Sequence, residues 1–367
     1  MDRSAQDVRA KADFGGAATS PVHMTRLAQD RLAWVDVAKG IGIILVVYGH
    51  ALRGFWGLKP WPSWTVAQDT LIYAFHMPLF FVISGLFLWQ SIERGKKNFI
   101  RSRWWAIIYP YLLWSFVCGG IEVAASRFAN TPMSLRDLWL IPVIPIEQFW
   151  FLYALLIVQL IGAVCFPSRP FLAVLAISGL SFAVFSGGST IFHVALRFLP
   201  FLTVGVCCAQ LIKRLPAEGR AVQTLAFALA WVAFAVIYGL GQTGAANTLA
   251  LGCLGTIGCI TFATLTAKSR IGRGLALLGQ ASMAIYVLHT LFSAGARAGF
   301  VILGLDRYAI WTLIAEFAVG LILPLPLWLW SRAHSKGHLF GFGRGPLRNV
   351  KENAAPLETN NALPELS

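Results

Sequence analysis

Charged residues are scarce in this 367-residue chain. Only 13% of its residues are Asp, Glu, Lys or Arg, whereas a soluble domain carries about 25%. Hydrophobic residues make up 57% of the chain, and many lie in runs close to the ~20 residues that a helix needs to cross a bilayer. No soluble core could bury so many long apolar runs. The scarcity of charge therefore excludes a soluble globular protein and indicates a polytopic membrane protein.

Several familiar catalytic signatures are missing from the sequence. It holds no H-E-x-x-H zinc motif, no Gly-rich phosphate loop and no convincing Ser–His–Asp pattern. Its six cysteines fall in or at the edge of apolar runs without metal-ligand spacing, which favours small buried residues over metal ligands. We therefore expect no metal site. The two halves of the chain show no internal repeat, and this weakens a transporter interpretation because many transporters are built from repeats.

A net charge of +14 would suggest nucleic-acid binding in a soluble protein. Here the basic residues gather in the tails and in alternate loops, as membrane topology requires, so we expect no nucleic-acid partner. The first 30 residues lack the short apolar core of a cleavable signal peptide. We interpret residues 1–38 as a polar cytoplasmic tail, 39–331 as the membrane domain and 332–367 as a second polar cytoplasmic tail.

The apolar runs predict an all-α protein with about ten transmembrane helices. Each run has roughly the length that a span needs and is bounded by Pro, Gly or charged residues. The fifth run is short and ends in Ser186, Gly187 and Gly188. The expected helices cover residues 40–57, 71–90, 104–123, 147–166, 170–187, 193–212, 222–240, 246–266, 281–304 and 308–330.

Lysine and arginine are unevenly divided between the connections. The even-numbered connections hold basic clusters, at residues 94–103, 213–220 and 268–273, while the odd-numbered connections hold few basic residues. Cytoplasmic loops carry the excess of Lys and Arg. We therefore expect both termini to be cytoplasmic and the protein to be a multi-pass protein of the cell inner membrane, in contact with membrane lipids.

Lys39 and His50 lie on one face of the first expected helix. They are eleven residues apart, which is about three helical turns and roughly 16 Å. Ionisable groups inside a bilayer are costly, and they are functional candidates by default. Lys39 could alternatively snorkel to the cytoplasmic headgroups, and Asp36 could cap the helix or pair with Lys39.

Four further polar residues fall between mid-membrane and the outer face. His76 precedes Pro78, which we expect to kink the second helix and to free a carbonyl group one turn back. His289 lies near the middle of the ninth expected helix, and Glu147 and Arg197 lie close to the outer ends of the fourth and sixth. Each alone could be a packing or interfacial residue, and Glu147 could pair with Arg197. Their shared depth favours one polar cavity.

Such a cluster suits proton transfer to or from a hydroxyl group. The unperturbed pKa of imidazole lies near neutrality, so a histidine can act as the general base that activates a sugar hydroxyl. A cation or a histidine donor can stabilise the oxyanion that forms when the hydroxyl attacks a thioester. Two other interpretations stay open. A transporter or flippase also carries charges at the midplane, and a sensor or assembly protein could use the cluster for packing alone.

The motifs of this chain resemble those of the acyltransferase-3 family, integral-membrane enzymes that acylate cell-surface sugars. The resemblance extends over about residues 31–330. It begins with a basic residue and a histidine separated by ten residues, Lys39 and His50, and the DVAKG segment around this lysine resembles the branch with fucose-acetylase-like members. The other motifs are FHMPLFFVISGLFL (75–88), RSRWWAIIYPYLLW (101–114), FWFLYALL (149–156), RFLPFLTVG (197–205) and S-x-x-I-Y-x-x-H (282–289).

This resemblance implies a ten-helix domain that transfers an acyl group, usually acetyl, from cytoplasmic acyl-CoA to a hydroxyl group of a lipid-linked or exported glycan. It implies that His50 is the catalytic base and that Arg103 binds the phosphates of the donor. Lys39 takes the place of the family's usual arginine, whose bidentate fork it lacks. Ala106 stands where many relatives have a second basic residue.

Residues and resemblance together predict an O-acetyltransferase that modifies an exopolysaccharide or another surface glycan. We expect acetyl-CoA as the acyl donor and a glycan or lipid-linked saccharide as the acceptor. The expected catalytic residues are His50, Lys39 and His76, the expected acceptor contacts are Glu147, Trp150, Arg197 and His289, and the expected donor contacts are Arg103 and Arg101.

Overall fold

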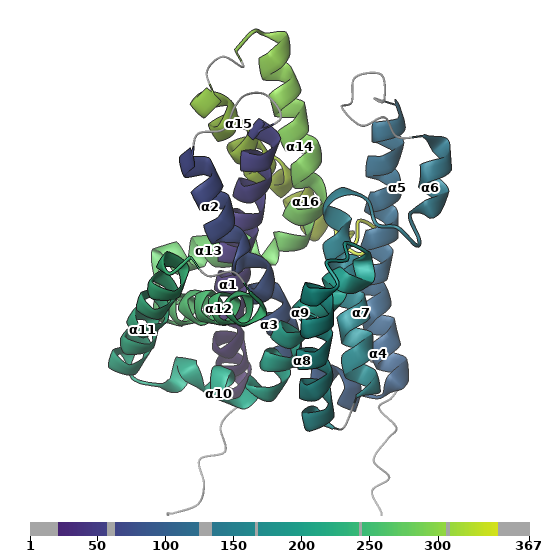
Figure 1. Ribbon diagram of the computed structural model, residues 1–367. Helices are drawn as coiled ribbons and strands as arrows, with labels where there is room; N and C mark the ends of the chain where they lie inside the picture. Colours follow the sequence, from purple (N-terminus) through teal and green to yellow (C-terminus); the bar gives the residue numbers. More distant parts are fainter. Residues whose placement is uncertain are drawn as a thin grey trace, which may run out of the picture.

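The computed structural model describes residues 21–56, 63–124, 134–165, 168–241, 244–305 and 309–343, and every regular element in these ranges is helical (Figure 1). This confirms the predicted all-α polytopic class. Residues 1–20 and 344–367 of the two expected tails lie outside the described residues, as do the expected helix ends at 57, 166 and 308.

Eight helices in the described ranges are long and apolar enough to cross a membrane, and one bent pair brings the number to nine. The sequence predicts ten, and the difference lies in the fifth run. Helix α8 (Arg169–Phe185) has 17 residues, and its apolar part falls short of a full span. The bent pair joins α9 (Ile191–Cys207) to the segment beginning with α10 (Ala209–Arg214) at an angle of 56°.

The remaining helices follow the expected runs with altered ends. Helix α1 begins at Pro21, well inside the expected N-terminal tail, although its apolar span is Ala33–Gly54. The other elements are α2 (Ser63–Tyr73), α3 (His76–Glu93), α4 (Lys96–Arg103), a π-helix η1 (Trp104–Ile108), α5 (Tyr109–Ala124), α6 (Leu135–Leu140), a 3-10 helix η3 (Glu147–Phe149), α7 (Trp150–Val164), a 3-10 helix η4 (Leu215–Ala217), α11 (Arg220–Gly239), α12 (Ala245–Thr266), α13 (Arg270–Gln280), α14 (Ser282–Ile302), α15 (Ala309–Ile322) and α16 (Pro324–Ala333).

The second span is broken where the sequence predicts a kink. Helix α2 ends at Tyr73 and α3 begins at His76, two residues before Pro78. A proline has no N–H to donate to the carbonyl four residues earlier, so the helix is weakest at this point. The imidazole of His76 crosses the break, because its Nδ1–H donates to the carbonyl of Ile72 at 2.7 Å. The break therefore fixes the position of a candidate site residue.

Helix α13 crosses α1 close to Lys39, where the basic residues of the sequence predict only a connection between two spans. The two backbones touch at two glycines. A Cβ atom on Gly40 would clash with the carbonyl of Leu275, and one on Gly279 would clash with the carbonyl of Asp36. The close packing that small residues allow between helices thus fixes the part of α1 around Lys39 against α13.

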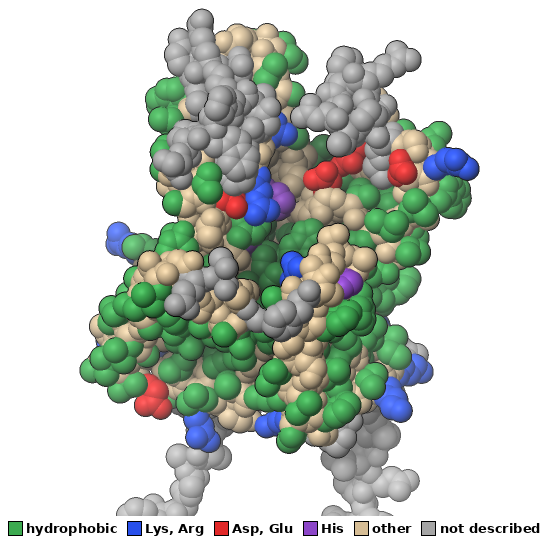
Figure 2. Space-filling view, viewed as in Figure 1, with side chains coloured by type: hydrophobic (Ala, Val, Ile, Leu, Met, Phe, Trp, Pro, Cys, Tyr) green, Lys and Arg blue, Asp and Glu red, His purple; other side chains and the backbone are tan. Residues whose placement is uncertain are grey.

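Helix α1 runs through the middle of the molecule, and α14, α15 and α2 stand together around its C-terminal part (Figure 1). Helices α5 and α6 stand across from this group. Figure 2 shows a hollow between the two groups, with histidine, basic and acidic side chains on the wall near α2 and α14 and acidic side chains on the opposite wall. This hollow lies at the His50 end of α1.

Candidate active site

Helices α1 and α14 pack against each other and bring two polar stripes face to face. On α1, Lys39 and His50 are eleven residues apart, as are Tyr286 and Arg297 on α14, with His289 between them. A separation of eleven residues is about three turns, so each set lies along one side of its helix. Candidate site residues therefore recur along most of the length of both α1 and α14.

Three histidines from three different spans gather around the middle of this contact. The rings of His50 and His289 meet edge to face, with their centroids 5.0 Å apart. His76 lies close enough to His50 to interact with it electrostatically. His50 is half-buried, whereas His76 and His289 are almost fully buried. Among the described residues, no group of three His, Cys, Asp or Glu side chains is arranged to hold a metal ion.

The tautomer of His289 is set by its own helix. Its Nδ1–H donates to the carbonyl of Tyr286 at 2.8 Å and lies 3.1 Å from that of Ile285. Because a carbonyl oxygen only accepts, Nδ1 carries the proton and Nε2 of the neutral ring holds a bare lone pair. Within the described part of the chain this Nε2 is buried without a hydrogen-bond partner. Buried polar atoms normally have partners, so Nε2 is free to accept a proton or a hydrogen bond.

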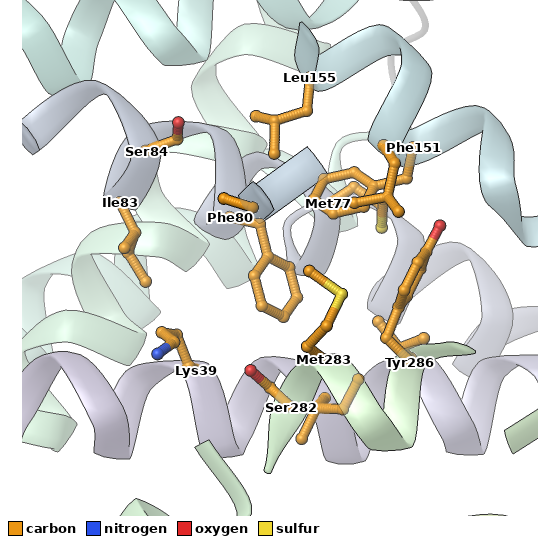
Figure 3. Close-up of a pocket in the computed structure, with 14 residues that line it drawn as sticks. Lys39, Met77, Phe80, Ile83, Ser84, Phe151, Leu155, Ser282, Met283 and Tyr286 are labelled. Carbon is orange, nitrogen blue, oxygen red and sulfur yellow. The ribbon is translucent and has the colours of Figure 1, made fainter. Parts of the chain in front are cut away.

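A cavity of about 200 Å³ lies between α1, α3, α7 and α14. Figure 3 shows Lys39 at one end and Tyr286 at the other, with Phe80 and Met283 between them. Val46 is four residues before His50 and Tyr286 is three residues before His289. The cavity therefore ends about one helical turn from the histidine pair. Its walls are mostly apolar, and they consist of Lys39, Ile43, Val46, Met77, Phe80, Ile83, Ser84, Ala106, Phe151, Leu152, Leu155, Ser282, Met283 and Tyr286.

The ammonium group of Lys39 pairs with the carboxylate of Asp36, and Nζ lies 3.0 Å from Oδ1. Both side chains are about 30% exposed, so the pair sits at the boundary between protein interior and surface. Of the alternatives that the sequence leaves open for Asp36, the structure shows the pairing. Lys39 nevertheless lines the cavity, which gives that cavity a cation at one end.

Arg103 is held behind the cavity wall by neutral partners. Its guanidinium donates to Gln159 Oε1 and, at 2.9 Å, to Ser91 Oγ. The amide of Gln159 donates in turn to Ser84, which lines the cavity. Ala106 lines the cavity directly, so the missing second basic residue leaves open space there. The neighbouring Arg101 is exposed.

Glu147 and Trp150 lie at the start of the fourth span. Glu147 is exposed, adopts a φ of +42° and lies close enough to Glu122 of α5 to interact with it electrostatically. The Trp150 ring stacks on Phe198 of α9 with 5.7 Å between centroids. Both residues thus belong to the side of the molecule formed by α5, α7 and α9.

Arg197 is engaged within its own hairpin. Its Nη2 donates to the carbonyl of Ala183 at 3.3 Å and to that of Gly188 at 3.4 Å. These carbonyl groups lie near the end of α8 and in the turn that follows it. Arg197 therefore binds the α8–α9 turn, and the structure shows this in place of the pairing with Glu147 that the sequence allows.

Two ion pairs near the histidines go beyond what the sequence predicts. Arg53 of α1 pairs with Asp69 of α2, and Arg297 of α14 pairs with Glu316 of α15. The signal was present, because Arg297 and Glu316 are charges inside the ninth and tenth apolar runs. The partner of each charge lies on another helix, and only the fold brings the two together.

The fold and the site define a polytopic membrane protein in which histidines from three spans meet beside an apolar cavity with a cation at its far end. The chain belongs to the acyltransferase-3 family, because the family's acyltransferase domain matches residues 32–332. The domain that the chain carries is thus an acyltransferase domain. This membership favours the acyltransferase interpretation over the transporter and the sensor interpretations.

Two curated relatives are nodulation proteins NolL from rhizobia. The protein from Sinorhizobium fredii is 30% identical over 211 residues, which cover 54% of this chain and 56% of the relative. The protein from Mesorhizobium japonicum is 34% identical over 123 residues, which cover 32% of each chain. The chain thus spans about half the length of the first relative and a third of the second. No solved structure gives a significant match to the chain.

Proposed function

We propose that this acyltransferase moves an acetyl group from acetyl-CoA, on the cytoplasmic side of the cell inner membrane, to a hydroxyl group of a surface or exported glycan. The cavity that leads from Lys39 to the histidine pair is the observation that carries this proposal. It offers an apolar path for the thioester arm of a donor, and it ends about one turn from groups that can accept a proton.

The cavity suits the pantetheine arm of coenzyme A, which is slender and mainly apolar with two amides. Ser84 and Ser282 supply hydroxyl groups in an otherwise apolar lining. Lys39 lies roughly 16 Å along α1 from His50. In the proposal Lys39 therefore contacts the donor at the inner end of the cavity, where it acts as a point charge, and the thioester lies near His50.

The proposed reaction needs one base and one leaving group. His50 accepts the proton of the acceptor hydroxyl while the hydroxyl oxygen attacks the thioester carbon. The C–S bond breaks, the thiolate of coenzyme A leaves and takes up a proton, and the glycan keeps the acetyl ester. The ring of His289 meets that of His50 edge to face, and its bare Nε2 is available to accept a hydrogen bond in the same site. His76, which donates from Nδ1 to the carbonyl of Ile72, is a further polar neighbour of His50.

A transfer assay tests the proposed function. Purified protein in proteoliposomes receives acetyl-CoA with a labelled acetyl group and, as acceptor, alkali-treated polysaccharide from a strain that lacks the protein. We expect label on the polysaccharide, and mass spectrometry should find it as an alkali-labile ester. Protein that releases coenzyme A without labelling the polysaccharide, or that does neither, would contradict the proposal.

The orientation predicted from the basic residues enters the proposal because it places the donor side. Single cysteines at Lys96 and Ser189, both exposed, test it on a cysteine-free background. A membrane-impermeant thiol reagent should label the cysteine at Ser189 in intact cells, and should label the one at Lys96 only after permeabilisation. The reverse pattern would invert the membrane domain and place the Lys39 end of the cavity outside.

Hydrogen bonds to Gln159 and Ser91 hold the guanidinium of Arg103 in place. In the proposal, its positive charge attracts the phosphates of the donor. Arg103→Ala should raise the KM for acetyl-CoA about tenfold, which is the scale of one hydrogen bond to a charged group. The effect should shrink only modestly at high salt, because the guanidinium is half-buried and salt screens partly buried charges much less than exposed ones. Arg94→Ala, which removes an exposed arginine just before α4, is the control. An unchanged KM with a lower melting temperature would instead make Arg103 a residue of the fold.

A further inference from the structure

Two ion pairs lie near the His50 end of α1. In each pair the arginine is more exposed than its carboxylate partner. Arg53 donates from Nε and Nη2 to Asp69 at 2.8 and 3.0 Å, and their side chains are 45% and 13% exposed. Arg297 donates from Nη1 to Glu316 at 3.1 Å, and their side chains are 30% and 0% exposed. Each guanidinium is thus anchored by a more deeply buried acid, and part of it stays accessible.

Both guanidinium groups lie about one turn beyond His50. Successive helical residues are about 100° apart, so position 53 lies about 60° to one side of His50 and position 54 about 40° to the other. Arg53 interacts electrostatically with His50. Arg297 reaches α1 at Gly54, where a Cβ atom would clash with Arg297 Nη1 and lie 2.8 Å from Glu316 Oε2. The two arginines therefore approach the site above His50 from its two sides.

These pairs are costly features of an intramembrane site. Charged residues in spans and buried ion pairs are weak sources of stability, because desolvation offsets their attraction. Two buried oxygens near them, Glu316 Oε1 and Tyr73 Oη, have no hydrogen-bond partner within the described residues. The Tyr73 ring lies under the Arg53 guanidinium, 3.4 Å from its centroid. Polar atoms left over beside anchored arginines indicate a binding surface rather than a packing device.

The chemistry of this surface selects the ligand. A guanidinium has five N–H donors, and the bonds described above use two on Arg53 and one on Arg297. The carboxylates of Asp69 and Glu316 are more deeply buried than the arginines. This wall therefore presents mainly hydrogen-bond donors, which bind oxygen acceptors of a ligand. Acidic side chains gather on the opposite wall of the hollow (Figure 2). Donors on one wall and acceptors on the other complement the hydroxyl and ring oxygens of a neutral saccharide.

We infer that Arg53 and Arg297, anchored by Asp69 and Glu316, form the acceptor-binding subsite of the enzyme, and that they hold saccharide oxygens next to the hydroxyl group that is acylated. This inference rests on the proposed function and assigns the acceptor to the outer end of the contact between α1 and α14. Asp69 and Glu316 are positioning residues in it, because they act through the arginines.

Arg297→Gln tests the subsite in the proteoliposome assay with acetyl-CoA and alkali-treated polysaccharide. The KM for the polysaccharide should rise about ten- to hundredfold, the scale of lost hydrogen bonds to a charged group. The KM for acetyl-CoA should stay as in the wild type. Arg136→Gln, at an exposed arginine of α6, is the matched control and should keep both KM values.

Two further variants keep the test decisive if Arg297→Gln alone fails to fold with Glu316 unpaired. The double variant Arg297→Gln with Glu316→Gln removes both charges and preserves the shapes of the side chains. Gly54→Ala keeps every charge and displaces Arg297, because its new Cβ takes the place of Nη1. The control for the second is Gly295→Ala on α14, where a Cβ meets nothing within 4 Å.

A rise in the KM for the polysaccharide in these variants, without a rise in the KM for acetyl-CoA, supports the subsite. Wild-type KM values for the polysaccharide in folded double variant and in folded Gly54→Ala would overturn it, and transfer by the wild type would still stand. Equal increases in both KM values would also overturn it, since the pair would then support the whole site. Absence of transfer by the wild type would instead defeat the proposed function, and the subsite with it.

Discussion

His50→Ala is expected to lower the rate of acetyl transfer by about 10²- to 10⁴-fold, the usual contribution of a general base. His50 is half-buried, touches His289 and lies about one turn beyond the cavity wall. No other described imidazole combines partial exposure with this contact to a second histidine. The measurement is label transferred to polysaccharide in proteoliposomes, normalised to the amount of folded protein by size exclusion.

A matched histidine variant separates chemistry from folding. His193 is also half-buried in an apolar helix, where it bonds Thr190 and stacks on Phe182 away from the cluster. His193→Ala removes the same number of atoms and should keep nearly all activity. If folded His50→Ala protein transferred acetyl groups at close to the wild-type rate, His50 would be a packing residue and the proposed mechanism would fail.

The fold was predictable wherever a feature depends on the sequence of one helix alone. Long apolar runs gave the spans, and Pro78 marked the break between α2 and α3, because both are properties of one segment. Helix α13 differs from the prediction, because its basic residues are typical of a cytoplasmic connection. Its apolar residues Leu275 and Leu278 recur at helical spacing and pack toward the core, which is the amphipathic signal of a helix.

The position of each candidate residue along its helix was predictable, but its neighbours were not. Lys39 and His50 share a face of α1 because a helical period fixes that relation. Glu147 lies at the start of η3 and Arg197 in the first half of α9, yet one lies near Glu122 and the other binds the α8–α9 turn. Depth follows from distance along a span, whereas neighbours follow from the packing of helices. For the same reason the sequence contained Arg297 and Glu316 without revealing the pair that they form.

Filling the cavity gives the second large effect. Ala106 lines the cavity and is exposed in η1, so a larger side chain can enter the cavity without displacing a packed neighbour. Ala106→Trp should fill the space that the thioester arm of the donor needs. Placing the Trp side chain and the thioester arm in one cavity should cost ~3 kcal/mol, the upper range for overpacking. We therefore expect kcat/KM for acetyl-CoA to fall about a hundredfold.

Ala228→Trp is the matched control for this prediction. Ala228 is exposed on α11, and it lines neither this cavity nor the other apolar one between α1, α11 and α12. Titration with coenzyme A separates binding from catalysis, since Ala106→Trp should weaken its affinity while Ala228→Trp should leave it unchanged. Undiminished coenzyme A affinity and kcat/KM in folded Ala106→Trp protein would place the donor elsewhere, and would leave the apolar cavity as a feature of packing between α1, α3, α7 and α14.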